Sequence, residues 1–167
     1  SGFLGRFVLR HLSSTADTIV PVSRRALPGI LRVAGYADAP AGDVLIHLAE
    51  AAYRDAVERA GSSYEQEAFA GLRALLQKRY QHVIYASSAV LYGDQAQTLR
   101  HPGDRVFVSD AYTRVKHRAE LAVLDAPGGI VARLGNLFGP GMSEENVMRA
   151  ILRQIPLRTR AAFEFRH

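Results

Sequence analysis

The chain has 167 residues, 48% of them hydrophobic, which is enough for one domain with a buried core. It has no cysteine, so disulfides, thiolate metal sites and cysteine nucleophiles are excluded, and its six histidines lack metalloprotease spacing. Its formal charge of +5 comes mostly from dispersed arginines, and no apolar run is long enough for a membrane span, so we expect a soluble, cytoplasmic protein with no metal, nucleic acid or membrane partner.

Apolar β-branched runs alternate with helical patterns along the chain. In order, the sequence predicts a helix at Phe3–Leu12, strands at Thr18–Val22, Ile30–Val33 and Val44–Leu48, helices near Ala49–Arg59 and at Tyr64–Arg79, a strand at Val83–Ala86, a helix at Ala111–Leu124, a strand at Ile130–Ala132 and a helix at Glu144–Arg153. This alternation predicts an α/β fold with a parallel sheet between helices, formed as a single domain over residues 1–167. The connection Ala34–Asp43 is short for a helical crossover, so we expect it to be irregular.

The first residues read "SGFLGRFVLRHL", with Gly2 and Gly5 at the start of an amphipathic helix. Glycines at a helix start let a phosphate approach backbone N–H groups and the positive end of the helix dipole. The full dinucleotide motif also needs a third glycine and a strand, both of which would precede Ser1. An ordinary tight turn explains Gly2 and Gly5 equally well.

Two further stretches carry candidate chemistry. In "VIYASSAVLYGD" an apolar strand ends on Ser87 and Ser88, and ligands of open parallel sheets bind at the carboxyl ends of strands. In "SDAYTRVKHRAE", Tyr112 and Lys116 are one helical turn apart, so a lysine cation near the phenol would favour the phenolate and create a general base. A surface tyrosine beside a solvated lysine is the alternative.

The motifs together resemble a known family. The glycine turn, "DVLIHLAEAA", "YASSAVLYG", "YTRVK" and "ARLGNLFGPG" follow the order and spacing of the extended short-chain dehydrogenase/reductases, in particular the NAD-dependent epimerase/dehydratase family acting on nucleotide sugars. The resemblance implies a Rossmann-like doubly wound parallel sheet with helices on both faces. The chain then lacks the first strand and most of the C-terminal substrate-binding portion, since "FEFRH" resembles the start of a later family segment.

The resemblance also implies catalytic roles. Ser88 matches the hydroxyl that hydrogen-bonds the substrate oxygen, Tyr112 the acid/base, and Lys116 the lysine that tunes the tyrosine and binds the nicotinamide ribose. Asn136 matches a substrate-binding position, although a turn asparagine is the alternative. Ser87 is expected to satisfy nearby backbone groups. In this chemistry a tyrosinate removes a proton from a sugar hydroxyl while a hydride passes to the nicotinamide.

The cofactor expectation rests on further positions. The residues that the resemblance assigns to the dinucleotide are Gly2, Phe3, Leu4, Gly5, Leu48, Ala49, Ala86, Tyr112 and Lys116. Ser23, Arg24 and Arg25 follow the predicted strand Thr18–Val22, which corresponds to the second strand of the family. At this position a carboxylate is typical of NAD enzymes, and arginines suit the 2′-phosphate of NADP. We therefore expect NADP, with NAD as the alternative.

The sequence departs from the family in several places. Glu50 stands where the family commonly has alanine, and a carboxylate there would repel the dinucleotide. No Asp-Glu pair follows Ser88, which favours epimerisation or ketone reduction over dehydration. The alternatives are a reductase of a smaller carbonyl substrate and a non-catalytic dinucleotide-binding or scaffold protein. A homodimer through the helices at 64–79 and 111–124 is a further expectation.

Overall fold

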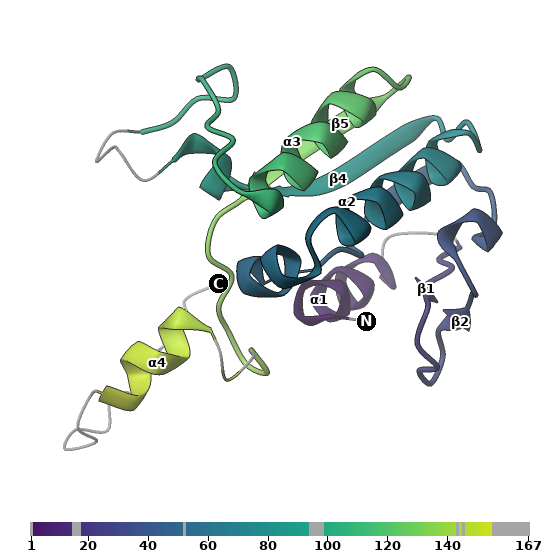
Figure 1. Ribbon diagram of the computed structural model, residues 1–167. Helices are drawn as coiled ribbons and strands as arrows, with labels where there is room; N and C mark the ends of the chain where they lie inside the picture. Colours follow the sequence, from purple (N-terminus) through teal and green to yellow (C-terminus); the bar gives the residue numbers. More distant parts are fainter. Residues whose placement is uncertain are drawn as a thin grey trace. The chain divides into compact units, whose positions relative to one another are not determined.

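The computed structural model describes residues 2–14, 18–51, 53–93, 99–142, 144 and 146–154, and the segment "FEFRH" lies outside them. The chain divides into two compact units, Ser1–Gly135 and Asn136–His167. In chain order the described elements are α1 (Phe3–Leu12), β1 (Val22–Ser23), β2 (Leu31–Arg32), a 3-10 helix (Tyr36–Asp38), β3 (Val44–His47), α2 (Arg54–Leu76), β4 (His82–Ser88), a second 3-10 helix (Ala89–Tyr92), α3 (Ala111–Leu124), β5 (Gly129–Leu134) and α4 (Val147–Gln154), most of which are labelled in Figure 1.

The main sheet has the order β3-β4-β5, and all three strands are parallel. Val44 of β3 lies opposite His82, and Ser88 at the end of β4 lies opposite Leu134 of β5. The connections are the long helices α2 and α3, as expected for parallel neighbours, which need a crossover. The predicted β-α-β alternation is confirmed, and β4 and β5 extend beyond their predicted ends.

Helices α2 and α3 pack against each other, and α3 covers β4 and β5 (Figure 1). Burial alternates along β4 because successive side chains of a strand point to opposite faces of the sheet. Every second residue, from Val83 through Tyr85 to Ser87, is therefore buried. The resulting hydrophobic cluster contains Leu72, Tyr80, Val83, Tyr85, Ala119 and Val123. Because Ala119 and Val123 of α3 are part of this cluster, the packing determines which face of α3 is turned toward β4.

A second, two-stranded parallel sheet pairs Val22 of β1 with Leu31 of β2. Within the described part of the chain, β3 pairs on one side only and does not join this sheet. The strand predicted at 18–22 overlaps β1 only at Val22, and the strand predicted at 30–33 is shortened to Leu31–Arg32. The irregular connection predicted for Ala34–Asp43 is confirmed, since it holds only the 3-10 helix Tyr36–Asp38.

Helix α2 bends at Gly61, whose backbone adopts φ 56° and ψ −139°. The two predicted helical segments are thus joined at a glycine conformation that other residues rarely adopt. The prediction of a helix near Ala49–Arg59 began too early, because α2 begins at Arg54. Residues 49–51 instead form an irregular stretch after β3, in which the Ala51 N–H donates to the Tyr64 hydroxyl at 2.6 Å.

In the second unit, α4 begins at Val147 rather than at Glu144. Glu144 forms ion pairs with Arg149 and Arg153, and Asn146 Nδ2 donates to the Leu137 carbonyl at 2.7 Å. No helix among the described residues is long and apolar enough to cross a membrane.

Candidate functional site

The N-terminus of α3 is defined by a capping box. Asp110 Oδ1 accepts a hydrogen bond from the Thr113 N–H at 2.7 Å, and Thr113 Oγ1 accepts from the Asp110 N–H at 3.0 Å. Glu58 of α2 accepts from the Ala111 N–H at 2.6 Å, which ties the two helices together here. Tyr112 and Lys116 follow one turn apart, and both are buried.

Lys116 extends from α3 to the end of β4. Its Nζ donates to the Ala86 carbonyl at 2.9 Å and lies 2.8 Å from Glu50 Oε2. The same Nζ is 5.0 Å from the centroid of the Tyr85 ring and 5.9 Å from that of the Tyr112 ring. The structure therefore brings together Ala86, Tyr112 and Lys116, three of the predicted site residues, and adds Glu50.

Glu50 is the centre of a buried polar group that we call the Glu50 cluster: Glu50, Lys116, Tyr85 and His47. Tyr85 donates its hydroxyl hydrogen to Glu50 Oε2 at 2.7 Å, and His47 Nε2 lies 3.8 Å from Glu50 Oε1. Repulsion of the dinucleotide by Glu50 stays a prediction. The ion pair between Glu50 and Lys116 was not predicted from the sequence. The signal available in the sequence was an unusual carboxylate, which reveals nothing of its partner.

The electrostatics of the cluster follow from these contacts. Burial by itself would raise the pKa of Glu50, but the contact with His47 and the positive charge of Lys116 outweigh it and lower the pKa to about 2. Burial, and then the Glu50 carboxylate, raise the pKa of Tyr85. At neutral pH the cluster thus contains an ionised carboxylate and a neutral phenol that donates to it.

The two aromatic members of the Glu50 cluster, His47 and Tyr85, contact each other, and Tyr36 contacts His47 from outside the cluster. The His47 ring stacks on Tyr85 at 5.9 Å between centroids, and Tyr36 meets His47 edge-on at the same distance. A small pocket opens here, lined by Arg24, Tyr36, His47, Ala49, Glu50, Tyr64, Glu67 and Ala68. Arg24 and Ala49, both predicted cofactor residues, thus lie at one pocket together with Glu50.

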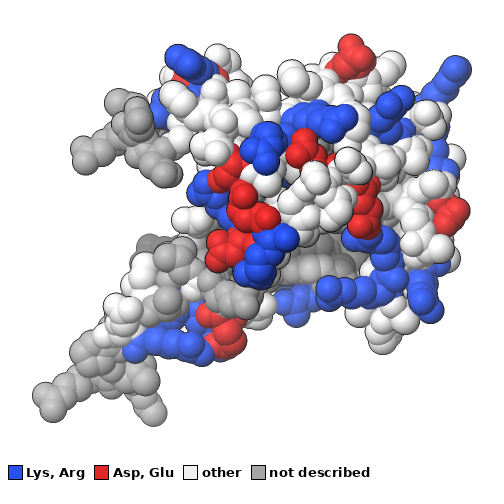
Figure 2. All heavy atoms as spheres, viewed as in Figure 1, with Lys and Arg blue, Asp and Glu red and all other residues white. Residues whose placement is uncertain are grey.

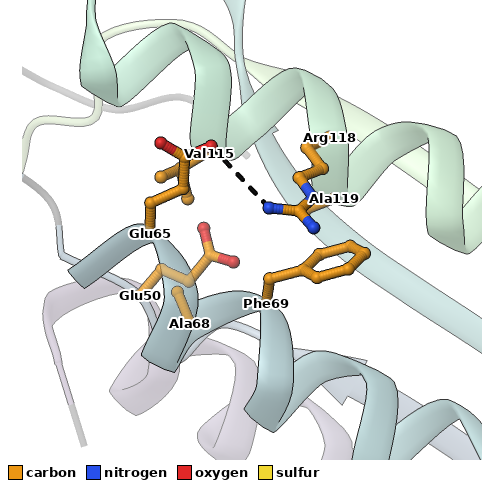
Figure 3. A pocket seen from close by; sticks show the side chains of 7 residues that line it. All are labelled: Glu50, Glu65, Ala68, Phe69, Val115, Arg118 and Ala119. Atoms are coloured by element: carbon orange, nitrogen blue, oxygen red, sulfur yellow. Dashed lines mark ion pairs between the residues drawn. The ribbon is translucent and has the colours of Figure 1, made fainter. Parts of the chain in front are cut away.

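A second pocket lies between α2 and α3, and Glu50 lines it as well. Figure 3 shows the Glu50 carboxylate directed toward the space between these helices, next to Glu65, Phe69 and Arg118. The Arg118 guanidinium lies 3.6 Å from the centroid of the Phe69 ring and 3.8 Å from Glu65 Oε1. Arg118, Glu65 and Phe69 line this side of the cluster.

The two serines have different surroundings. Ser88 caps the 3-10 helix Ala89–Tyr92, and its Oγ accepts from the Val90 N–H at 3.3 Å. Ser87 was expected to satisfy nearby backbone groups, and this is wrong, because its buried Oγ has no hydrogen-bond partner among the described residues. The cause is the strand alternation, which turns Ser87 to the same buried face as Tyr85.

The remaining predicted cofactor residues lie on other elements. Gly2 is the N-cap of α1, and Phe3, Leu4 and Gly5 belong to its first turn, but no residue of this helix is buried. A Cβ added at Gly2 would meet no atom within 4 Å, so the chain itself does not require glycine there. Leu48 directly follows β3.

Ser23 is the last residue of β1, and Arg24 and Arg25 follow it directly. Ser23 Oγ accepts from the Arg25 N–H at 3.0 Å. Arg24 forms an ion pair with Glu67 of α2 and lies 5.3 Å from the centroid of the Tyr36 ring. Of the two arginines expected to bind a 2′-phosphate, Arg24 is therefore paired with a carboxylate. Asn136 belongs to the second unit.

The geometry can be compared with known proteins. The sequence pattern of the "NAD dependent epimerase/dehydratase family" matches residues 1–162, nearly the whole chain. The chain belongs to this family. No curated protein matches the sequence. In the described ranges, no three His, Cys, Asp or Glu side chains gather in a way that could hold a metal ion.

Solved structures of family proteins share the fold. MoeE5 in complex with UDP-glucose and NAD is 22% identical, with a TM-score of 0.67 over 91% of this chain and 57% of that protein. RMD from Pseudomonas aeruginosa complexed with NADPH is 23% identical, with a TM-score of 0.69 over 92% of this chain and 56% of that protein. The NDP-hexosamine 5,6-dehydratase TunA is 18% identical, with a TM-score of 0.73 over 89% of this chain and 56% of that protein.

These similarities establish the Rossmann-like fold of this epimerase/dehydratase family member. The chain spans little more than half of the length of the three solved structures.

Proposed function

We propose that this protein is an NAD(P)-dependent oxidoreductase or epimerase that acts on a nucleotide sugar. The observation that carries the proposal is the placement of Lys116, which is buried beside Tyr112 on α3 and hydrogen-bonded to the end of β4. Ligands of open parallel sheets bind at this end of the strands. Membership of the family adds to this argument.

The proposed chemistry assigns one role to each residue. Tyr112 moves a proton to or from a sugar hydroxyl, and Ser88 donates a hydrogen bond to the same oxygen. Lys116 orients the dinucleotide and supports the ionised form of the tyrosine by its charge. A bound nicotinamide dinucleotide supplies hydride transfer. Asn136 is proposed to contact the substrate.

The residues of the site fit a dinucleotide in part. The Lys116 ammonium and the Tyr112 hydroxyl are donors of the kind that ribose hydroxyls accept, and Leu48 and Ala49 follow β3 at the edge where dinucleotides bind. Gly2 to Gly5, at the N-terminus of α1, are proposed to approach the phosphates. The Glu50 carboxylate is the one group of this set that opposes a phosphate-bearing ligand by its charge.

We propose NADP as the cofactor, with NAD as the alternative. Arg24 and Arg25 supply positive charge after β1, and Arg24 already lies over the Tyr36 ring. Binding of a 2′-phosphate by Arg24 would replace its ion pair with Glu67. NAD and NADPH each occur in structures of the proteins described above.

A nucleotide sugar is the proposed substrate because MoeE5 was solved with UDP-glucose and TunA is named for an NDP-hexosamine. We also infer a second candidate, a non-catalytic dinucleotide-binding protein. The ion pair between Glu50 and Lys116 favours this second candidate, because the pairing engages the lysine that the proposed chemistry needs.

Calorimetric titration of the full-length protein with NADPH and NADH tests the proposal. Micromolar binding, tighter for NADPH, is the expected result, and failure of the folded protein to bind either nucleotide would overturn it. Nucleotide sugars are then screened against the wild type and Tyr112→Phe, which is expected to lose at least about a hundredfold in kcat. Tyr53→Phe, at an exposed position outside the site, is the control and should keep full activity.

A further inference from the structure

The ion pair between Glu50 and Lys116 joins two residues far apart in the sequence. The side chains are 7% and 9% exposed, so both charges are removed from water and each depends on the other. Breaking such a pair by removing one partner leaves a buried charge without compensation. The pair is therefore a persistent feature of the folded chain.

The carboxylate is held by more than Lys116. Tyr85 donates to the same Glu50 oxygen, Oε2, and His47 lies against the other, Oε1. These contacts come from β4 and from β3, which are fixed to each other by the sheet. Glu50 cannot turn away from Lys116 without leaving the hydroxyl of Tyr85 unpaired in a buried place.

The hydrogen-bonding capacity of Lys116 is thereby largely used. An ammonium has three N–H groups, and the Ala86 carbonyl and Glu50 accept two of them. A ribose hydroxyl can use only the third unless it displaces Glu50.

We infer that Glu50 is a positioning residue that restrains Lys116 and lowers the affinity of this site for nicotinamide dinucleotides, an inference that rests on the function proposed above. Lys116 is assigned to the nicotinamide ribose, which NADH and NADPH share. Glu50 therefore weakens the binding of both nucleotides by the same factor and leaves the preference between them unchanged.

The test is calorimetric titration of full-length wild type and Glu50→Gln with NADH and with NADPH. The amide removes the negative charge at nearly constant volume, and we expect the Kd for both nucleotides to fall about tenfold. Glu65→Gln is the matched control, because it removes the same charge from a residue that lines the same α2–α3 pocket and pairs with Arg114 and Arg118. Its Kd values should stay within about twofold of wild type.

A double-mutant cycle shows whether Glu50 acts through the lysine. In a Lys116→Gln background, Glu50→Gln is expected to change the Kd by less than about twofold, whereas general charge repulsion would keep the whole effect. If circular dichroism shows that Glu50→Gln does not fold, Glu50→Asp replaces it. The shorter side chain keeps the charge but holds the ammonium less closely, so we expect a smaller fall in both Kd values.

The outcomes separate this inference from the proposed function. If the wild type binds and the folded Glu50 variants bind equally well or more weakly, the role of Glu50 is overturned and the function stands. If Glu50→Gln binds and the folded wild type does not, the role of Glu50 is supported, whereas the function proposed for the wild type is overturned. If no variant binds either nucleotide, the proposed function is overturned, and the inference with it.

Discussion

The Glu50 carboxylate should make the stability of the protein depend on acid pH. Its pKa is lowered from 4.5 to about 2 in the folded chain, so the unfolded state binds a proton first as the pH falls. The stabilisation is complete above about pH 5 and is lost toward pH 2, a loss on the order of 3 kcal/mol. Among the described residues, Lys116, Tyr85 and His47 contact the carboxylate, and the titratable groups of Glu65, Arg118 and Tyr64 line the two pockets beside it.

Melting temperatures measured by circular dichroism between pH 7 and pH 2.5 test this prediction. The wild type should lose more stability over this interval than Glu50→Gln, whose amide does not titrate. Glu65→Gln should follow the wild-type curve. Parallel curves for the wild type and Glu50→Gln would contradict the lowered pKa.

The ion pair between Arg24 and Glu67 should influence the preference of the protein for NADPH over NADH. Glu67→Gln leaves Arg24 without its carboxylate partner, so the guanidinium is free to bind a 2′-phosphate. We expect the ratio of NADH Kd to NADPH Kd to rise about threefold to tenfold, and Arg24→Ala to lower it by a similar factor. Equal effects on both nucleotides would place Arg24 away from the 2′-phosphate. Glu50→Gln is the contrasting variant, because it is expected to leave this ratio unchanged.

At the scale of elements, two glycines of α2 should respond oppositely to substitution. Gly61 has φ 56° with no atom within 4 Å of an added Cβ, so Gly61→Ala meets backbone strain alone and should cost about 1–3 kcal/mol. Gly71 lies inside the helix, and a Cβ there would contact the Tyr36 ring at 3.5 Å, an ordinary distance. Gly71→Ala should therefore stabilise by up to about 1 kcal/mol.

Urea unfolding of the two variants measures both values. The free energy of unfolding should decrease for Gly61→Ala and increase for Gly71→Ala, with unchanged slopes. A decrease for both variants would show that the α2–Tyr36 contact does not tolerate a methyl group. No change at Gly61 would show that α2 can straighten there.

The sequence predicted correctly the elements whose ends depend on neighbouring residues in the chain. Helix α3 runs over the predicted residues because Asp110 and Thr113 cap it, and Tyr112 and Lys116 share a face because their spacing is helical. Strand β1 was predicted too early in the chain and β2 too long, since the position and length of a strand depend on its pairing partners, which local sequence does not show. For the same reason the contact of Glu50 with Lys116 was not predictable, because it forms only when β3, β4 and α3 assemble.

At the scale of the whole molecule, the charges on the face in view give little indication of a partner. Figure 2 shows basic and acidic side chains interspersed on the face in view, in agreement with the dispersed arginines of the sequence. Apolar exposure is more informative, because Leu121 and Leu124 of α3 are 57% and 59% exposed. Aliphatic side chains of this size on one helix are suited to a protein contact, and we propose the homodimer at this surface.

The double variant Leu121→Lys/Leu124→Lys is expected to dissociate this dimer. Two lysines at the contact would have to be desolvated without partners, so the self-association constant should fall at least a hundredfold, as measured by sedimentation equilibrium. Ile130→Lys on β5 is the control, since Ile130 is also exposed, at 48%, but lies outside α3. A wild type that is monomeric at high micromolar concentration, or a double variant that still dimerises, would exclude this face of α3 as the interface.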